Sequence, residues 1–576
     1  MAHATGRDYD IGRDSSSPDN SKVEYGFKEH GAIDAHDAQL YTDPDRKDES
    51  LHRGLKARQI SMIAIGGAVG TGLIIGTGSA LQKAGPASIL IAYSLIGVLV
   101  YVVMCSLGEM ATWLPAAGGF ATYATRFCDP ALGFALGYTY WFKYIIITPN
   151  QLTAASLVIQ FWLPAERVNP GVWIAIFMVI IIAINYFGIR FFGEFEFWLS
   201  SIKVVVIIGL LILLICITSG GVEGQDAIGF RYWNDPGAFH PYIATGSWGR
   251  FLAIWSSMVT AVFAFLGTEL IGVTVGEAEN PRRNVPRAIK LTFWRILVFY
   301  VFSVLLLGMC VPYNSEILVS ATKGGAAGNK SSAAASPFVV AIEMARIKYL
   351  DHIMNAAILI FVFSAANSDL YIASRTLHGQ AMKGFAPKFL AKTNKKGVPV
   401  PALALSACFC CLAFMSVSSG SRTVFGYFVN LVSIFGLLTW VSILVSYIYF
   451  VKARRAQGVD EKSMRYKSPF GLWGAYCALA FCVLVSLTKN FDVFVGGFDY
   501  KNFITGYLGI PLYLIMILGY KIVKRTKEVN PAEADLWTGK DVVDADEAEW
   551  LAKEADDKAH GRRPNVIYRH TLGYLF

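Results

Sequence analysis

Long apolar runs alternate with short polar connections over most of the chain. About twelve of these runs approach the roughly 20 mostly apolar residues that a membrane-spanning helix needs. They cover residues 60–81, 86–107, 131–161, 171–189, 197–218, 251–276, 291–311, 338–373, 402–418, 424–451, 472–488 and 503–523. The pattern predicts an all-α integral membrane protein with about twelve transmembrane helices. Two runs, the third and the eighth, are long enough to tilt or to extend beyond the membrane.

Polar segments flank the apolar part of the chain. Residues 1–58 are polar and mixed in charge, with "DSSSPDNS" near the start, and we expect a disordered cytosolic tail. Residues 59–525 are the predicted transmembrane domain, and residues 526–576 a second cytosolic tail. No apolar core with a small-residue cleavage site precedes the first run, so we expect the first span to act as the targeting signal.

Composition and charge placement support this organisation. Hydrophobic residues make up 54% of the 576 residues, mean hydropathy is +0.45, and charged residues are 16%, below the usual quarter of a soluble chain. The net charge is +9, and its lysines and arginines gather before the first run and after the sixth, eighth, tenth and twelfth. This alternation predicts that both termini are cytosolic. The basic clusters flank spans and carry no base-stacking aromatics, so we expect no nucleic-acid partner.

The nine cysteines lie mostly inside apolar runs. Cys408 and Cys411 have C-x-x-C spacing, but on a helix that we expect to lie in lipid. Packing explains them better than redox chemistry, and we predict no disulfide framework, no metal site and no cofactor.

The first run is unusually rich in glycine for a helix in lipid. "ISMIAIGGAVGTGLIIGTGSAL" holds six glycines within thirteen residues, and each costs a helix roughly 1 kcal/mol relative to alanine. Gly67 and Gly72 have the outer spacing of a phosphate-binding loop, but Leu73 and Ile74 stand where Lys and Ser/Thr are needed. Two interpretations remain: a close helix–helix contact, or a helix unwound at the midplane to bind a small zwitterion.

The sixth run favours the unwound helix. It reads "VTAVFAFLGTELIGVTVGEAENP", with Glu269 in its middle beside Gly267 and Thr268. An ionisable residue at that depth is expensive and indicates function. Spans one and six are equivalent if spans 1–5 and 6–10 form two repeats, which we infer from segment order alone. Paired interruptions in two halves are typical of a secondary transporter's binding site.

Several motifs resemble those of the fungal amino acid permeases, the yeast amino acid transporter family within the amino acid–polyamine–cation superfamily. The matching stretches extend from about residue 53 to 530. They include "GGAVGTGL", "SLGEMATWLPAAGGFATYATRFCDPALGFALGYTYWFKY", "FGEFEFWLSSIKV", "GTELIGVTVGEAENPRRNVPRAI" and "FSAANSDLYIASRTLHGQA". The resemblance implies a LeuT-like fold, in which a five-plus-five inverted repeat with broken helices 1 and 6 is followed by two C-terminal helices. It also implies proton-coupled amino acid uptake at the plasma membrane.

The resemblance also implies roles for individual residues. Backbone groups of the first span would hold the substrate α-carboxylate at the positive end of a half-helix; these are Gly67, Ala68, Gly70, Thr71 and Gly72. The sixth span would hold the α-ammonium through carbonyls around Phe265, Leu266 and Gly267, with Thr268 beside them.

Three charged residues are candidates for proton coupling. Lys203 matches a lysine that stands where sodium-coupled relatives bind their cation, which favours protons over sodium. Glu109 and Glu269 are the acids that would carry or gate the proton. Each has a structural alternative: Glu109 as a cytosolic surface charge or pair, Glu269 as a network residue, and Lys203 as the partner of a nearby carboxylate.

The polar patch "ANSD" on the eighth span adds further candidates. Ser364 and Asn367, with neighbouring Ser368 and Asp369, could line the site or bond between helices. The sequence leaves these two interpretations open.

Substrate class is indicated by the third span, "YWFKYIIITPNQLTAASLVIQ". Many members of the resembled family carry glutamate where this chain has Gln151, and losing that carboxylate removes repulsion of an acidic substrate. Lys143 lies eight residues earlier, about two helical turns, so both side chains should share one face. The segments "TPNQLTA" and "ANSDLYIASRTL" resemble the dicarboxylic branch of the family, and we predict import of glutamate and aspartate. The alternatives are that Lys143 extends to the interface while Gln151 bonds between helices, and that the chain is a broad neutral amino acid permease.

The tails raise a second class, a non-transporting amino acid sensor, but their modest length does not favour it. The C-terminal tail carries Leu536, Trp537, Trp550 and Leu551 among acidic residues, which indicates a short amphipathic helix on the cytosolic face or the membrane. The resemblance suggests ubiquitin ligase adaptors as partners, with Lys22, Lys28 and Lys47 as candidate acceptors. No paired histidines, nucleophile elbow or metal spacing support a membrane enzyme.

Overall fold

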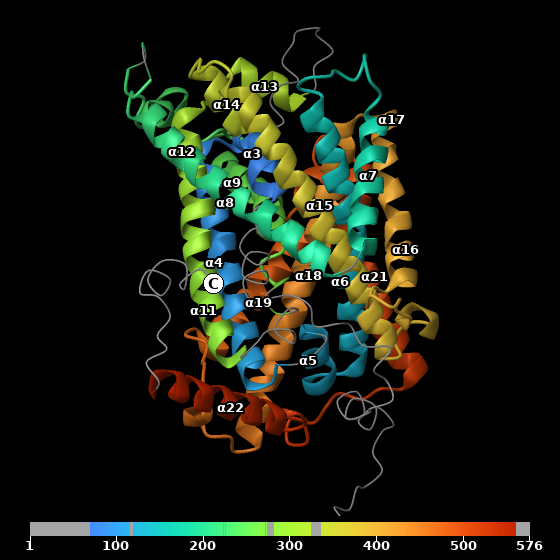
Figure 1. The fold of residues 1–576 in the computed structure, drawn as a ribbon. Coiled ribbons are helices and arrows are strands. Elements are labelled where there is room, and N and C mark those ends of the chain that lie inside the picture. The colour runs from blue at the N-terminus through green and yellow to red at the C-terminus, as the bar shows by residue number, and fades with distance from the viewer. Residues whose placement is uncertain are drawn as a thin grey trace, which may run out of the picture. The chain divides into compact units, whose positions relative to one another are not determined.

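The computed structural model describes residues 70–115, 119–187, 189–222, 224, 226–270, 272, 281–323 and 336–559. Every regular element within these ranges is helical, which confirms the all-α prediction. The longer elements are α4 (Pro86–Trp113), α6 (Pro130–Ile159), α7 (Pro170–Phe187), α8 (Ile189–Thr218), α9 (Gly246–Phe265), α11 (Pro281–Arg295), α15 (Leu350–Met382), α18 (Ser421–Ala456), α19 (Gly471–Thr488), α21 (Gly509–Lys524) and α22 (Lys540–Ala559). Figure 1 shows them as a bundle of long helices.

Shorter helices connect or extend the long ones. They are η2 (Gly72–Gly76), α3 (Thr77–Ala84), α5 (Phe120–Phe127), η3 (Trp233–Gly237), η5 (Ile296–Phe302), α12 (Ser303–Cys310), α13 (Glu316–Lys323), α14 (Pro337–Met344), η6 (Lys388–Ala391), α16 (Val400–Cys408), η7 (Phe409–Phe414), α17 (Met415–Ser419), η8 (Glu461–Ser463), η9 (Phe491–Phe494) and α20 (Tyr500–Tyr507).

Each of the twelve predicted apolar runs has a helical counterpart in the described residues. Nine helical segments there are long and apolar enough to cross a membrane, and α20 with α21, bent by 42°, makes a tenth. The first segment, described from Gly70, and α6 fall outside this set. The chain is a multi-pass membrane protein.

The eighth run is not one helix, contrary to the sequence prediction. It divides into α14 and α15, and the connection holds Arg346 and Tyr349 at φ 54° and φ 65°. The connection also holds Lys348, and these charged residues inside the run are a signal of the break that the sequence prediction did not use. The division lets Pro337 at the start of α14 lie against Gly78, where an added Cβ would come within 3.2 Å of the proline ring.

Packing between elements follows the order expected for two repeats. α6, the third predicted span, packs against α15, the eighth, and also against α18. In the same way, η2 of the first segment packs against α9 of the sixth. Elements that hold equivalent places in the two halves therefore contact each other.

The C-terminal segment docks on the end of the bundle where α4 ends and α11 begins (Figure 1). Arg282 pairs with Asp544 and Glu547 of α22. The Trp113 indole donates a hydrogen bond to the buried Leu536 carbonyl at 3.0 Å. The helix predicted in this tail is thus present, but it begins at Lys540, after Leu536.

Candidate functional site

The sixth segment is interrupted at the predicted place. α9 ends at Phe265, and Leu266 is extended at φ −61° and ψ 142°. Gly267 has φ 94°, a conformation that L side chains rarely adopt, and the chain is helical again at Leu270. The broken helix leaves backbone groups of residues 266–269 at the centre of the bundle.

In the first segment the structure supports the close helix–helix contact, and the unwound helix stays a prediction because Gly66 and Gly67 lie outside the described residues. η2 is a single π-helical turn, a feature often found at functional sites. A Cβ on Gly72 would lie 2.4 Å from the Ala264 Cα, so this glycine permits close contact with α9. Gly70, in contrast, faces open space. Gly67 and Ala68 lie outside the described residues.

A small cavity lies between these two segments. Its volume is about 20 Å³, room for about one water molecule and too little for an amino acid. Residues proposed from sequence that line it are Gly70, Thr71, Gly72, Lys143, Gln151, Leu266 and Gly267. Lys143 and Gln151 thus reach one cavity from one helix, as their spacing predicted. That these residues bind substrate stays a prediction.

Lys143 and Glu269 form a fully buried ion pair at the edge of this cavity. The Lys143 ammonium contacts the Glu269 carboxylate and lies 4.5 Å and 4.4 Å from the ring centres of Tyr140 and Tyr144. The same carboxylate accepts hydrogen bonds from the Gly267 N–H at 3.2 Å and from the Trp440 indole at 3.4 Å. Glu269 is therefore anchored to the helix break itself.

A polar chain crosses the cavity from the first segment to the eighth. The Thr71 hydroxyl donates to the Gln151 side-chain oxygen at 2.8 Å, and the Gln151 amide nitrogen donates to Asp369 at 3.2 Å. Asp369 is buried and lines the cavity with Ser368. Sequence reasoning noted Asp369 in its polar patch but did not include it among the site residues.

The other candidates on the eighth segment lie outside this cavity. Ser364 donates to Glu196, which also accepts from Ser200 and lies 3.6 Å from the Lys203 ammonium. Asn367 accepts a hydrogen bond from Asn185 at 3.0 Å. Lys203 thus has the carboxylate partner that its structural alternative requires. Sequence reasoning missed Glu196, although an acidic residue inside an apolar run, in "FGEFEFW", was a usable signal.

Two candidates on the sixth segment also point away from the cavity. Phe265 stacks on Tyr300, with ring centres 4.4 Å apart. The Thr268 hydroxyl donates to the Phe265 carbonyl at 3.0 Å, which occupies one acceptor direction of the oxygen proposed for the α-ammonium. Leu266 and Gly267 are the members of this group that line the cavity.

Glu109 belongs to a separate cluster near the docked C-terminal segment. It accepts from the Tyr447 hydroxyl at 2.7 Å and from the Ser468 N–H at 2.8 Å, and lies 3.1 Å from Arg454. Glu109, Tyr447 and Arg454 border a second cavity of about 240 Å³. Glu109 is fully buried and ion-paired, not a surface charge.

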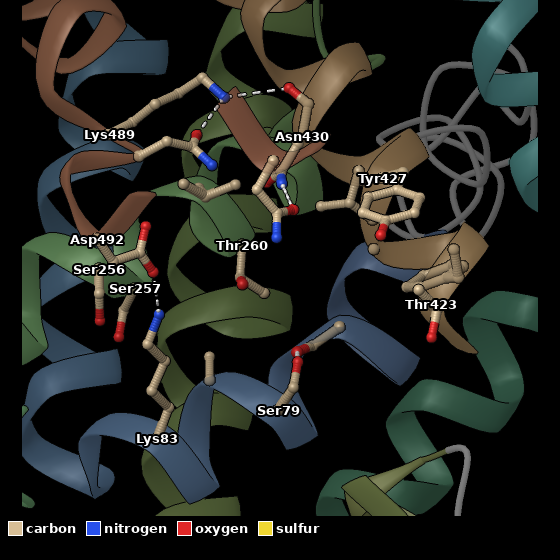
Figure 2. Close-up of a pocket in the computed structure, with 18 of the residues that line it drawn as sticks. Ser79, Lys83, Ser256, Ser257, Thr260, Thr423, Tyr427, Asn430, Lys489 and Asp492 are labelled. Atoms are coloured by element: carbon tan, nitrogen blue, oxygen red, sulfur yellow. Dashed lines mark hydrogen bonds and ion pairs between the residues drawn. The ribbon is translucent and has the colours of Figure 1, made fainter. Parts of the chain in front are cut away.

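A third and larger hollow, called the vestibule here, has polar and charged side chains along its wall (Figure 2). Its α3 wall lies toward the end of the bundle away from α22 (Figure 1). Its volume is about 650 Å³, and its walls come from η2, α3, α9, α18 and the segment that follows α19. Phe425 lines the vestibule, Phe263 lines the small cavity, and their rings meet edge to face with centres 6.0 Å apart. This aromatic pair lies between the two spaces.

Comparison with known proteins agrees with this architecture. The family model described as "Amino acid permease" matches residues 59–530. A dicarboxylic amino acid permease of Saccharomyces cerevisiae is 55% identical, across 92% of this chain and 88% of its own length. A proline-specific permease of Emericella nidulans is 39% identical across 91% of this chain and 93% of its own length. A lysine-specific permease of Saccharomyces cerevisiae is 36% identical across 92% of this chain and 87% of its own length. With a matching family model over most of its length and relatives aligned nearly end to end, the chain belongs to the amino acid permease family.

Proposed function

We propose that this permease imports glutamate and aspartate together with protons across the plasma membrane. The observation that carries the proposal is the buried Lys143 at the wall of the central cavity, where a side-chain carboxylate would find a cation. The 55% identity to a protein named a dicarboxylic amino acid permease supports the same substrate class. The family supports amino acid transport, and not an enzymatic activity.

The ion pair offers a mechanism for proton coupling. A substrate carboxylate that binds Lys143 takes the place of Glu269. The Glu269 carboxylate is then buried without a cation, and an uncompensated buried charge is costly enough to favour protonation. Substrate binding and proton uptake would therefore occur together. The family resemblance assigns Lys203 to the place where sodium-coupled relatives bind their cation, and a lysine there would favour coupling to protons.

The rest of the substrate fits the broken helices. Backbone groups from Gly70 to Gly72, at the start of the first described helix, would hold the α-carboxylate. Carbonyls of Leu266 and Gly267 would hold the α-ammonium. Gln151 keeps the third helix uncharged at this point, which avoids repulsion of the second carboxylate.

The three cavities suggest an order of events. We place the vestibule outside the cell and the Glu109 cluster inside, because the basic connections gather at the Glu109 end and mark the cytosolic side. Both termini, residues 1–58 and 526–576, are then cytosolic, on either side of a membrane domain at 59–525. Substrate would enter from the vestibule, pass the Phe263–Phe425 pair, and leave past Glu109.

Charge sets a minimum proton number for accumulation. An acidic amino acid carries one net negative charge, so one proton makes transport electroneutral. Two protons are needed before the membrane potential contributes, at roughly 2.3 kcal/mol per charge per 100 mV. We also propose that ubiquitin ligase adaptors act on the N-terminal tail, where Lys22, Lys28 and Lys47 are candidate acceptors.

The deciding experiment is uptake of labelled glutamate in permease-deficient yeast that express the chain. Unlabelled aspartate, leucine and arginine serve as competitors at acidic and neutral external pH. We expect competition by aspartate alone and faster uptake at acidic pH. Strong competition by leucine would refute the acidic specificity and favour a broad neutral permease. No flux of any amino acid, with the protein present at the cell surface, would refute transport and favour a sensor.

A further inference from the structure

The vestibule contains a buried lysine that no carboxylate of the described residues contacts directly. Lys489, at the end of α19, is 1% exposed and lines this hollow. Its ammonium donates to the Asn430 carbonyl at 3.1 Å and to the Asn490 side-chain oxygen at 2.8 Å. Both partners are neutral, and among the described residues no carboxylate lies within 4.0 Å of this nitrogen. An ammonium has three donors, so one remains available.

The two carboxylates of the vestibule wall are engaged elsewhere. Asp492 pairs with Lys83 at 3.0 Å and accepts from the Tyr242 hydroxyl at 3.0 Å. Asp499 accepts from the backbone N–H groups of Lys501 and Asn502, at the start of α20. Figure 2 shows Asp492 turned toward Lys83, with Lys489 next to Asn430 at another part of the wall. Neither acid contacts Lys489 directly in the described structure, and Asp492 attracts it only through space.

A buried charge is normally paired, because isolation from water removes its solvation. The vestibule also has the size of a small-molecule site, since its 650 Å³ falls in the usual range of about 300–1,000 Å³. Amide side chains of Asn430, Asn490 and Asn502 line the same space and can orient a polar guest.

We propose that the vestibule is an outer binding site, in which Lys489 holds a carboxylate of the incoming acidic amino acid before it reaches the central cavity. The proposal rests on the function proposed above, since the ligand is the same substrate. The outer site shares η2 and α9 with the central cavity, so a guest bound there contacts the segments that must move to admit it.

The test compares initial rates of glutamate uptake by Lys489→Gln, Lys489→Arg and unaltered protein, each normalised to the amount at the cell surface. Lys501→Gln is the matched control, because this lysine is exposed and does not line the vestibule. We expect Lys489→Gln to raise KM for glutamate about 3- to 10-fold with kcat nearly unchanged, and Lys489→Arg to restore most of the affinity. We also expect KM of the unaltered protein to rise with ionic strength, and this dependence to weaken in Lys489→Gln.

Thr423 gives a second variant that leaves the Lys489 hydrogen bonds intact. It is an exposed residue of the vestibule wall, so substitution should not disturb folding. Thr423→Asp places a negative charge on the vestibule wall across from Lys489 (Figure 2), which disfavours any anionic guest in the hollow, and should raise KM for glutamate, whereas Thr423→Asn should not.

Several results would overturn the outer site. An unchanged KM in Lys489→Gln, or in Thr423→Asp if the lysine variant does not reach the surface, would do so. A lower kcat with unchanged KM and unchanged salt dependence would assign Lys489 a structural role. If the unaltered protein carried no glutamate or aspartate, the proposed function would fail first, and the outer site with it.

Discussion

Separating Lys143 from Glu269 should be among the most damaging changes in this protein. Both side chains are fully buried in the described structure, and their charges neutralise each other. Removing one partner of a buried pair typically costs about 3–5 kcal/mol, whereas replacing both by uncharged groups is often close to neutral. We therefore expect Lys143→Met and Glu269→Gln each to destabilise the protein strongly, and the double variant to recover much of the loss.

The assay is thermal inactivation of detergent-solubilised, fluorescently tagged protein, scored by the fraction that stays monodisperse after heating. Membrane proteins often unfold irreversibly, so the midpoint is compared at one heating time. Lys501→Met, which removes an exposed lysine, is the control and should leave the midpoint unchanged. The two single variants and the double variant form a double-mutant cycle. The coupling energy between Lys143 and Glu269 from this cycle should reach about 2 kcal/mol, within the range for contacting groups.

The pH dependence of stability and of uptake provides a second test of the same variants. In Lys143→Met, the stranded Glu269 carboxylate can be neutralised by a proton, so the loss of stability should shrink as pH falls. In Glu269→Gln, we expect exchange of glutamate to persist while concentrative, pH-dependent uptake disappears. If the losses of the two single variants simply add in the double variant, the ion pair has no energetic role and the coupling mechanism is refuted.

Four further outcomes follow from the contacts described above. Gly72→Ala should abolish uptake, because its Cβ would lie 2.4 Å from the Ala264 Cα. Gly209→Ala is the control and should be tolerated, because its Cβ meets open space. Amino acid uptake and the amount of protein at the cell surface are measured for both variants. Gln151→Glu should reduce kcat/KM for glutamate about 10-fold or more, because it sets a second carboxylate near the substrate and beside Asp369, which now lies 3.2 Å from the Gln151 amide nitrogen. The control is Gln160→Glu at the end of the same helix, and an equal loss in that variant would contradict this reason. Arg282→Gln should increase the rate of amide hydrogen exchange in residues 540–559 about 3- to 10-fold, because it removes the partly exposed ion pairs with Asp544 and Glu547. Lys462→Gln is the control. No increase in Arg282→Gln would mean that these ion pairs do not hold α22. Partial burial of Asp544 opposes its ionisation, but hydrogen bonds from Lys540 and Arg282 prevail and lower the pKa of Asp544. Because a lowered pKa in the docked state favours docking at higher pH, attachment of α22 should be constant from pH 8 to 5 and weaken as pH falls below about 4, the ordinary pKa of aspartate, in the same exchange measurement.

The sequence predicted the parts of the site that depend on local signals. A glycine two residues before an acidic residue inside an apolar run located the break at Leu266–Glu269, because lipid makes both features costly. Helical periodicity placed Lys143 and Gln151 on one face, and both line the central cavity.

Features that depend on contacts between distant segments could not be predicted in this way. Nothing in the third span shows that Lys143 meets Glu269, 126 residues away. Asp369 resembled any polar residue between helices until the chain through Gln151 placed it at the cavity. The break between α14 and α15 was missed although Arg346 and Lys348 interrupt the apolar run there, because charged residues at one point of a run do not report the backbone direction.

The contact between Gly72 and Ala264 has a mechanical consequence for transport. The two broken segments touch there through backbone atoms, with no flexible side chain between them to absorb a displacement. A shift of η2 by a few tenths of an ångström is therefore transmitted directly to α9. The two segments should travel as one rigid part during each transport cycle, and the sliding surfaces should lie where this part meets α6, α15 and α18.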